Sequence, residues 1–103
     1  SSFMIIPAKP TPTSLKSKKS KQITYSWNKD SNASGYQIQY STSSSFSKKK
    51  TKSYIISKNS TKSKTFSSLK KKKKYYVRMR SYKTIDGKRQ FSSWSKKMSV
   101  KTK

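Results

Sequence analysis

The side chains that could carry out chemistry in this chain are few. The sequence of 103 residues contains no histidine and no cysteine, which removes the commonest general bases and the preferred zinc ligands. Its two carboxylates, Asp30 and Asp86, are the only pair that could serve as general acid and general base, as in a glycoside hydrolase. Both fall in predicted loops, so we interpret Asp30 as a loop residue and Asp86 as a turn former. We therefore predict no enzymatic activity, no catalytic residues, no metal site and no cofactor.

Positive charge dominates the composition. Lysine and arginine contribute 27 residues and aspartate and glutamate only 2, so the formal net charge is +25. A charge of this size attracts polyanions and makes the compact chain repel itself. A glycine-rich phosphate-binding loop is excluded, because Gly35 and Gly87 are the only glycines. Any anion binding would therefore depend on basic side chains.

Aromatic residues near two arginines form a second candidate surface. Three aromatic residues, Tyr76, Tyr82 and Phe91, fall on outward or hairpin positions near Arg78 and Arg80. They could form a stacking surface for nucleic acid or sugar. The alternative is cross-strand pairing on an exposed sheet face, with arginine stems covering the rings. Phe46 is expected to plug the edge of the core, and Trp94 to cap one end of it.

The elements that must position these side chains are predicted to be short strands. Apolar and polar residues alternate along most of the chain, which is typical of strands with one buried face. Seven strands are predicted. Five lie near residues 11–15, 22–27, 36–41, 51–57 and 75–85, a short one ends near residues 66–68, and the last ends the chain. Inward positions are expected at Ile23, Tyr25, Trp27, Tyr36, Ile38, Tyr40, Met98 and Val100. Asp86-Gly87 predicts a hairpin turn, because both residues tolerate positive φ. The predicted fold is thus all-β, a seven-stranded antiparallel sandwich.

The N-terminal segment differs from the rest in its proline content. All three prolines lie in it, at Pro7, Pro10 and Pro12. Proline fixes φ and donates no hydrogen bond, so residues 1–10 are predicted to be a linker or leader and residues 11–103 a single domain. The apolar run Phe3–Ile6 is far too short to span a bilayer, so no transmembrane segment is predicted.

The segment from Leu69 to Arg80 is the most informative local pattern. Tyr75 follows Leu69 by six residues, across a run of five lysines, and Tyr75, Val77 and Met79 then alternate with more polar residues. A tyrosine at the start of such a strand can bury its ring and return its hydroxyl to the backbone of the preceding turn, an arrangement called the tyrosine corner. The turn contains no glycine, so Lys72 is expected in a conformation that glycine would adopt at lower cost.

At this point the chain resembles a fibronectin type III domain, of the lysine-rich type found in surface and secreted proteins of Gram-positive bacteria. The resemblance runs from about residue 7 to residue 103 and is carried by segments 23–27, 35–41, 44–46, 69–80, 94–95 and 98–102. It implies an immunoglobulin-like sandwich in which Trp27, Tyr36, Leu69 and Tyr75 are structural. It also implies a module of a larger polypeptide with neighbouring domains as partners, monomeric when isolated and located outside the cell or at its surface.

The strand order of that family would bring three lysine clusters and the C-terminus to one end of the sandwich. These residues are Lys16, Lys18, Lys19 and Lys21, then Lys48, Lys49, Lys50 and Lys52, then Lys70, Lys71, Lys72, Lys73 and Lys74, and finally Lys101 and Lys103. The second and third clusters are the candidate polyanion-binding residues. The alternative is that all of them are solvated turn residues that keep the sheet edges soluble.

The sequence leaves two function classes open. The first is a non-catalytic spacer or interaction module of a larger bacterial surface or secreted protein. The second is a polyanion-binding module for wall teichoic acid, anionic glycan or nucleic acid, which would act through the lysine-rich end.

Overall fold

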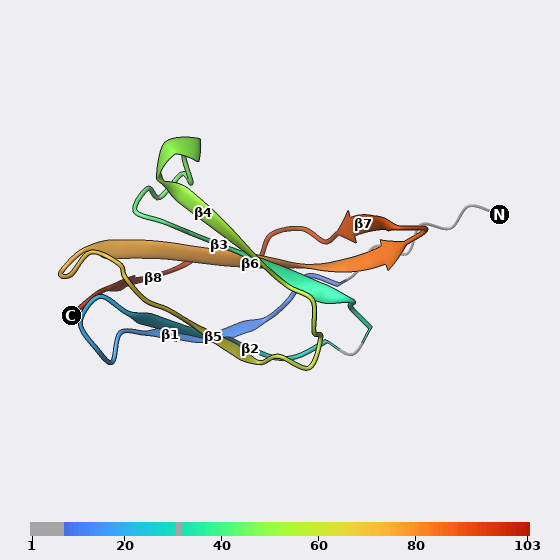
Figure 1. The fold of residues 1–103 in the computed structure, drawn as a ribbon, viewed down its shortest axis with the longest axis horizontal. Helices are drawn as coiled ribbons and strands as arrows, with labels where there is room; N and C mark the ends of the chain where they lie inside the picture. The colour runs from blue at the N-terminus through green and yellow to red at the C-terminus, as the bar shows by residue number, and fades with distance from the viewer. Residues whose placement is uncertain (1–7, 31) are drawn as a thin grey trace.

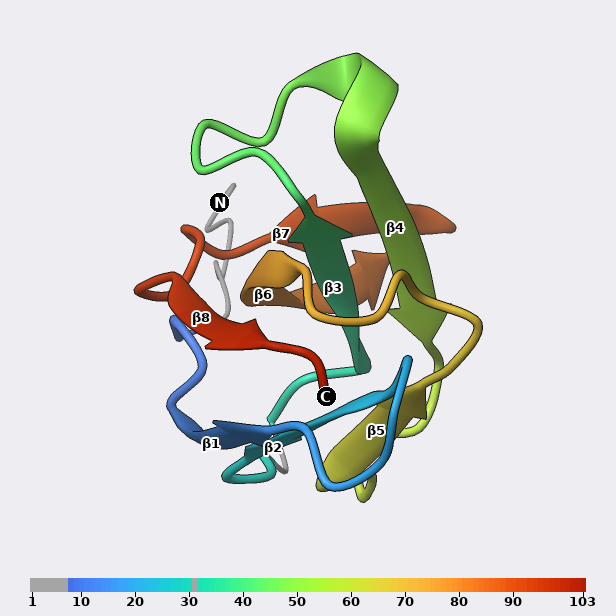
Figure 2. The ribbon, with the colours of Figure 1, turned by 90° about the vertical axis from the view of Figure 1, so that its left-hand side faces the viewer.

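Two antiparallel sheets face each other in the computed structural model, which describes residues 8–30 and 32–103 (Figure 1, Figure 2). The first sheet has the order β1 (Pro12–Lys16), β2 (Ile23–Trp27), β5 (Ser63–Phe66). The second has the order β4 (Thr51–Ile56), β3 (Gly35–Ser41), β6 (Lys74–Ile85), β7 (Lys88–Phe91), and β8 (Met98–Lys101) also pairs with β6. A short 3-10 helix, η1 (Lys48–Lys50), precedes β4. The predicted all-β antiparallel sandwich is therefore confirmed.

The core between the sheets is built from alternate residues of β2, β3 and β6. Its fully or almost fully buried side chains include Ile23, Tyr25, Trp27, Tyr36, Ile38, Val77 and Met79. The rings of Tyr25, Trp27 and Tyr36 form a chain with neighbouring centroids 5.7 Å apart. Leu69, Tyr40, Met98 and Val100 are partly buried and pack against this core. Strand alternation thus predicted the buried face correctly, because successive side chains of a strand point to opposite sides of the sheet.

The last predicted strand is two strands, so the fold has about eight rather than seven. Residues 92–97 leave the regular ladder between β7 and β8. The hydroxyl oxygens of Ser92 and Ser95 in this segment accept hydrogen bonds from the backbone N–H groups of Ser81 and Met79 in β6, each at 3.0 Å. Serine side chains therefore satisfy donors that an uninterrupted strand would satisfy with carbonyl groups. The detour directs Trp94 to the outer face of the second sheet.

Two turns adopt the backbone conformations that their residues predicted. Asp86 and Gly87 have φ values of 52° and 76°, as the tight hairpin between β6 and β7 requires. Lys72, between β5 and β6, has a φ of 52°. A lysine therefore occupies the left-handed region that glycine enters at lower cost.

Tyr82 shows where alternation alone misleads. It lies on the outward side of β6, as predicted, but its side chain is only 3% exposed. It faces Gly35 on the neighbouring strand, where a Cβ atom would lie 2.6 Å from the Tyr82 hydroxyl. The Phe91 ring lies 5.9 Å away on its other neighbour, β7. The absence of a side chain at Gly35 thus makes room to bury a tyrosine on the outer face.

Part of the predicted linker contacts the domain. Pro10 is buried, and the Ala8 carbonyl accepts a hydrogen bond of 2.7 Å from the Ser81 hydroxyl. The remainder of that prediction, including Pro7, lies outside the described residues.

Candidate functional site

Backbone hydrogen bonds tie two lysine-rich turns and the C-terminus together at one end of the sandwich (Figure 1). The Lys21 carbonyl, in the β1–β2 turn, accepts from Leu69 N–H in the β5–β6 turn at 3.0 Å. Lys21 N–H in turn donates to the carbonyl of Lys103 at 3.4 Å. We call this end the lysine-rich pole and define it by the lysines at residues 16–21, 70–74 and 101–103, together with Lys49 and Lys50 of η1 and Lys52 of β4.

The β5–β6 turn of the pole is held from two sides. The Tyr75 hydroxyl accepts a hydrogen bond of 2.9 Å from Lys70 N–H, which is the arrangement that the Leu69–Tyr75 spacing predicts. The Thr102 hydroxyl donates to the Lys70 carbonyl, and its oxygen accepts from Lys73 N–H at 3.0 Å. The five lysines at positions 70–74 are exposed at the surface of this anchored turn.

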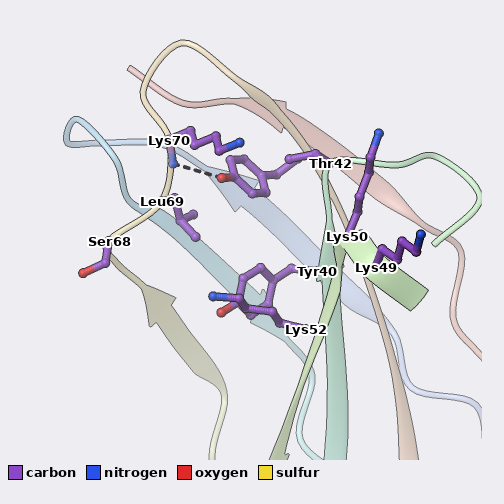
Figure 3. A pocket seen from close by; sticks show the side chains of 9 residues that line it. Tyr40, Thr42, Lys49, Lys50, Lys52, Ser68, Leu69 and Lys70 are labelled. Atoms are coloured by element: carbon purple, nitrogen blue, oxygen red, sulfur yellow. Dashed lines mark hydrogen bonds between the residues drawn. The ribbon is translucent and has the colours of Figure 1, made fainter. Parts of the chain in front are cut away.

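A pocket of about 300 Å³ opens at the pole between the two sheets (Figure 3). Its lining residues are Tyr40, Thr42, Lys49, Lys50, Lys52, Ser68, Leu69, Lys70 and Tyr75. Figure 3 shows Lys49 and Lys50 on one side and Leu69 and Lys70 on the other, with Tyr40 between them. Three lysines of the second cluster and Lys70 of the third thus meet at a common cavity, whereas Lys71, Lys72, Lys73 and Lys74 do not line it.

Lys48 lies apart from the other candidate residues. It lines a different cavity, of about 370 Å³, together with Phe46 and Arg78. Arg78 alternates with the inward Val77 and Met79, so this cavity opens on the outer face of the second sheet. The helical turn of η1 separates Lys48 from Lys49 and Lys50, which face the first pocket.

The outer face of the second sheet carries a continuous stack of rings and guanidinium groups. The Arg78 Cζ atom lies 4.2 Å from the ring centroid of Phe46 and 4.3 Å from that of Trp94. The Arg80 Cζ atom lies 4.4 Å from the Trp94 centroid and 3.8 Å from that of Phe91. We call these five residues the arginine ladder. At such distances a guanidinium interacts favourably with each ring face.

Two glutamines of β3 hold the arginines of the ladder in place. Gln39 Oε1 accepts from both Arg78 Nε, at 3.0 Å, and Arg78 Nη2, at 2.7 Å, while Gln37 Oε1 accepts from Arg80 Nε at 2.7 Å. Desolvation lowers the pKa of Arg78 and of Arg80, and for Arg80 the neighbouring charge of Arg78 lowers it further. Each arginine therefore has a glutamine partner through its guanidinium as well as its ring contacts.

The arginine ladder contradicts the predicted positions of Phe46 and Trp94 and favours one of the two interpretations of the aromatic surface. Phe46 does not plug the core edge and Trp94 does not cap the core, because both stack on arginines outside it. The rings proposed as a stacking surface already have cationic partners. Tyr76 too has the ammonium groups of Lys74 and Lys97 over its ring, at 5.4 and 5.7 Å. The geometry favours the interpretation in which basic side chains cover these rings.

Sequence reasoning missed the glutamine partners, although a signal was present. Gln37 and Gln39 alternate on β3, and Arg78 and Arg80 alternate on β6. The antiparallel register places Gln37 opposite Arg80 and Gln39 opposite Arg78. Matching pairs of this kind on adjacent strands indicate a cross-strand contact once the register is known.

The two carboxylates occupy loop positions. Asp30 Oδ1 accepts from Asn32 N–H at 2.9 Å within the β2–β3 loop, and Asp30 N–H donates to the Tyr36 hydroxyl at 2.6 Å. Desolvation raises the pKa of Tyr36. Asp86 is exposed in the β6–β7 turn. Both residues serve local turn structure.

The family model of the fibronectin type III domain matches residues 8–98. The chain belongs to the fibronectin type III family. Fibronectin type III domains are typically modules of larger proteins and are generally non-catalytic. No curated protein matches the chain.

Several solved fibronectin type III structures share the fold. The FN1–FN3 domains of chicken CNTN1 match with a TM-score of 0.75 and 23% identity, covering 93% of this chain and 31% of that one. The domain of the human collagen alpha-1(XX) chain matches with a TM-score of 0.74 and 18% identity over 99% of this chain and 90% of the other. A domain of human contactin 1 matches with a TM-score of 0.76 and 17% identity over 99% and 83%. The chain thus spans less than a third of the chicken structure, which contains several such domains.

Within residues 8–30 and 32–103, no helix has the length and apolar character needed to cross a membrane.

Proposed function

We propose that this fibronectin type III domain is a non-catalytic spacer or interaction module of a larger bacterial surface or secreted protein. The observation that carries the proposal is the placement of the chain ends. Asn28 N–H donates to the Thr11 carbonyl at the β2–β3 loop, whereas Lys103 bonds to Lys21 and Ser17 at the lysine-rich pole. The described chain therefore enters at one end of the sandwich and leaves at the other. Such an arrangement suits modules joined in series.

The chemistry of the side chains supports a role without catalysis. The sequence offers no histidine or cysteine, Asp30 accepts a hydrogen bond within its own loop, and Asp86 lies exposed in a hairpin turn. The ladder arginines are already bonded to glutamines and stacked on rings. An extracellular or cell-surface location agrees with the bacterial modules that the sequence resembles.

A replacement experiment in the longer polypeptide tests the spacer against the interaction module. Residues 8–103 would be deleted, or exchanged for an unrelated fibronectin type III domain of similar length. For a spacer, deletion reduces antibody access to the distal flanking domain on intact cells, and the exchange restores it. A loss of function that the exchange does not restore indicates an interaction module. Full function after deletion would refute both roles.

A second candidate function is polyanion binding at the lysine-rich pole. The bonds among the β1–β2 turn, the β5–β6 turn and the C-terminus favour it, because they concentrate ammonium groups on one surface. The chain's only aspartates belong to the β2–β3 loop and the β6–β7 turn, at the opposite end of the strands that lead to the pole. Concentrated lysines attract polyanions such as wall teichoic acid, anionic glycan or nucleic acid without reading a sequence.

Salt-dependent binding tests this second candidate. Dissociation constants on the order of 10⁻⁴ to 10⁻⁶ M at physiological salt, rising steeply with added salt, are expected for such contacts. Glutamine in place of residues 70–74 should flatten the salt dependence. The matched control replaces five exposed lysines at the opposite end: Lys9, Lys29, Lys58, Lys62 and Lys88. Equal effects of both variants, or binding that salt does not weaken, would contradict a localised electrostatic site.

A further inference from the structure

We propose that the pocket between Tyr40 and Lys70 binds a phosphorylated sugar or polyol, with the phosphate among the lysines and the carbon skeleton against Tyr40. The inference rests on the polyanion-binding candidate and deepens it, because it names the chemical unit that the pole recognises. It assigns this role to a subset of the pole, centred on Lys50 and Lys70. The unit could be a free metabolite or the repeating group of a phosphate-linked polymer, and the experiment below separates these sources.

The pocket has the size and position of a small-ligand site. Its volume of about 300 Å³ lies at the lower end of the range for such sites. One wall comes from η1 and β4 of the second sheet, and the other from the β5–β6 turn that follows the first sheet (Figure 3). The pocket therefore lies at the edge where β4 of one sheet and β5 of the other are not paired.

The charge of the pocket is of one sign. Lys49, Lys50, Lys52 and Lys70 line it, and no carboxylate does. Lysine interacts with phosphate as a compact point charge and can approach it from several directions. Four lysines that line one cavity without a carboxylate attract phosphate, which carries up to two negative charges as a monoester and one on each repeat of a phosphate-linked polymer.

The basic walls are held by the backbone rather than by the lysine side chains. Lys70 N–H donates to Tyr75 and the Lys70 carbonyl accepts from Thr102, so the position of its Cα is set on both sides. On the opposite wall, Lys50 N–H donates to the Ser47 carbonyl at 3.1 Å, and the Thr51 hydroxyl donates to the same carbonyl at 2.7 Å. The backbone on both sides of the pocket thus needs little reorganisation on binding, so the entropic cost is confined to the side chains.

The remaining lining favours a ligand with a carbon skeleton over a bare anion. The Tyr40 ring is half-buried and held against Phe66, with centroids 4.5 Å apart. Leu69 adds apolar surface, while Thr42 and Ser68 add hydroxyl groups. Sugars and polyols suit a lining of this kind, because their C–H groups pack on aromatic rings and their hydroxyls donate and accept hydrogen bonds.

Amide chemical-shift titrations test the inference on the intact domain at constant ionic strength. The probes are glucose 6-phosphate, glycerol 3-phosphate, inorganic phosphate and glucose. We expect saturable shifts for the two phosphorylated probes at Tyr40, Leu69 and Lys70, weaker binding of inorganic phosphate, and none of glucose. Shifts spread over all lysine clusters without saturation would overturn the pocket. So would inorganic phosphate binding as tightly as the phosphorylated probes.

Paired charge variants provide the matched control. Lys50→Gln with Lys70→Gln should weaken glucose 6-phosphate binding about tenfold or more, since each charged hydrogen bond contributes appreciably. Lys16→Gln with Lys18→Gln removes the same charge from the pole outside the pocket and should have a much smaller effect. Equal losses in the two variants would refute a defined site.

Polymers separate this inference from the candidate on which it rests. If wall teichoic acid or polyphosphate binds while the small phosphate esters do not, the pocket inference fails and the polyanion-binding pole stands. If neither class binds, both fail. If both bind and compete for the same amides, the pocket recognises the repeating unit of the polymer. If small esters bind and the polymer does not compete, the ligand is a free phosphorylated metabolite.

Discussion

The hydroxyl of Tyr75 accepts a hydrogen bond from the backbone N–H of Lys70 at 2.9 Å, across a turn that contains no glycine. The Tyr75 ring is only 6% exposed, so this bond links a core residue to the most basic turn of the chain. Without it, Lys70 N–H would lose this partner, and the turn would depend on its bonds to Thr102 and Lys21.

Replacing Tyr75 by phenylalanine tests the value of this bond. The ring remains in the core while a partly buried N–H loses its acceptor, which costs about 1–3 kcal/mol of unfolding free energy. A urea titration measures the change. Tyr54→Phe, at a 42% exposed position, is the control for removing a phenol. Equal stability of the Tyr75→Phe variant and the wild-type domain would show that the bond contributes nothing.

The arginine ladder should depend on guanidinium geometry as well as on charge. Arg78→Lys keeps the positive charge but removes the planar group that stacks on Phe46 and Trp94 and bonds to Gln39. We expect a loss of about 1–2 kcal/mol, because two cation–π contacts and a forked hydrogen bond weaken together.

Chemical unfolding of matched arginine variants measures that loss. Arg89→Lys is the control, because Arg89 is exposed and has one ring contact, at 5.2 Å from the Tyr82 centroid. A ladder that contributes through charge alone would leave the Arg78→Lys variant as stable as the control.

The two glycines are required for different reasons and should respond differently to alanine. A Cβ at Gly35 would lie 2.1 Å from the backbone carbonyl oxygen of Ile56, so the strands must move apart. We expect a loss of about 3 kcal/mol or more, at the upper end for overpacking. Gly87 has open space but a φ of 76°, so alanine there should cost only about 1–2 kcal/mol of backbone strain. Thermal unfolding of both variants tests this order, and the reverse order would contradict it.

Added salt should stabilise the domain. A net charge of +25 repels itself more strongly in the compact state than in the expanded chain. Screening shortens the Debye length to roughly 8–10 Å near physiological ionic strength and relieves more of this repulsion in the folded state. We therefore expect the melting temperature to rise from low to moderate sodium chloride, and to rise further in sulfate, which is excluded from protein surfaces. A flat or falling melting temperature would refute the argument.

Alkaline pH should destabilise the fold through Tyr25. Burial raises the pKa of this phenol above its ordinary value of 10.0. Above about pH 10 the unfolded chain therefore releases a proton that the folded chain retains, so stability falls as pH rises. Tyr25→Phe should reduce the slope of unfolding free energy against pH in this range.

The comparison for Tyr25 relies on the fact that Tyr25→Phe keeps every other ionisable group of the wild-type domain. The difference between wild-type and variant slopes isolates the phenol, because both proteins carry the same lysines. Tyr54→Phe again supplies the exposed control. Parallel pH profiles for the wild-type and Tyr25→Phe domains would show that this phenol does not titrate differently in the two states.

Much of the fold could be predicted because the relevant signals are local. The buried positions of β2 and β3 follow from alternation within each strand, and the Asp86-Gly87 hairpin follows from residues that tolerate positive φ. The left-handed conformation of Lys72 follows from a tight turn that contains no glycine. In each case a few neighbouring residues carry the whole signal.

The outer face was harder to predict because its contacts join distant segments. From their local sequence, Phe46 and Trp94 were predicted to pack against the core, yet both stack on arginines of β6. The position of Trp94 depends on the irregular path of residues 92–97, which the hydroxyls of Ser92 and Ser95 stabilise. Tyr82 is buried because its cross-strand neighbour happens to be Gly35.

By itself, the sequence determined the class of fold, the composition of the core, the extreme net charge and the small number of side chains suited to catalysis. These properties depend on residue type and on periodicity, which the covalent order contains directly. Only the tertiary structure decided which lysines share a pocket, that Lys48 is excluded from it, and that Arg78 and Arg80 are already engaged by Gln39 and Gln37. Those outcomes depend on strand register and on how the turns and edge strands of the two sheets come together, and packing of the whole chain sets both.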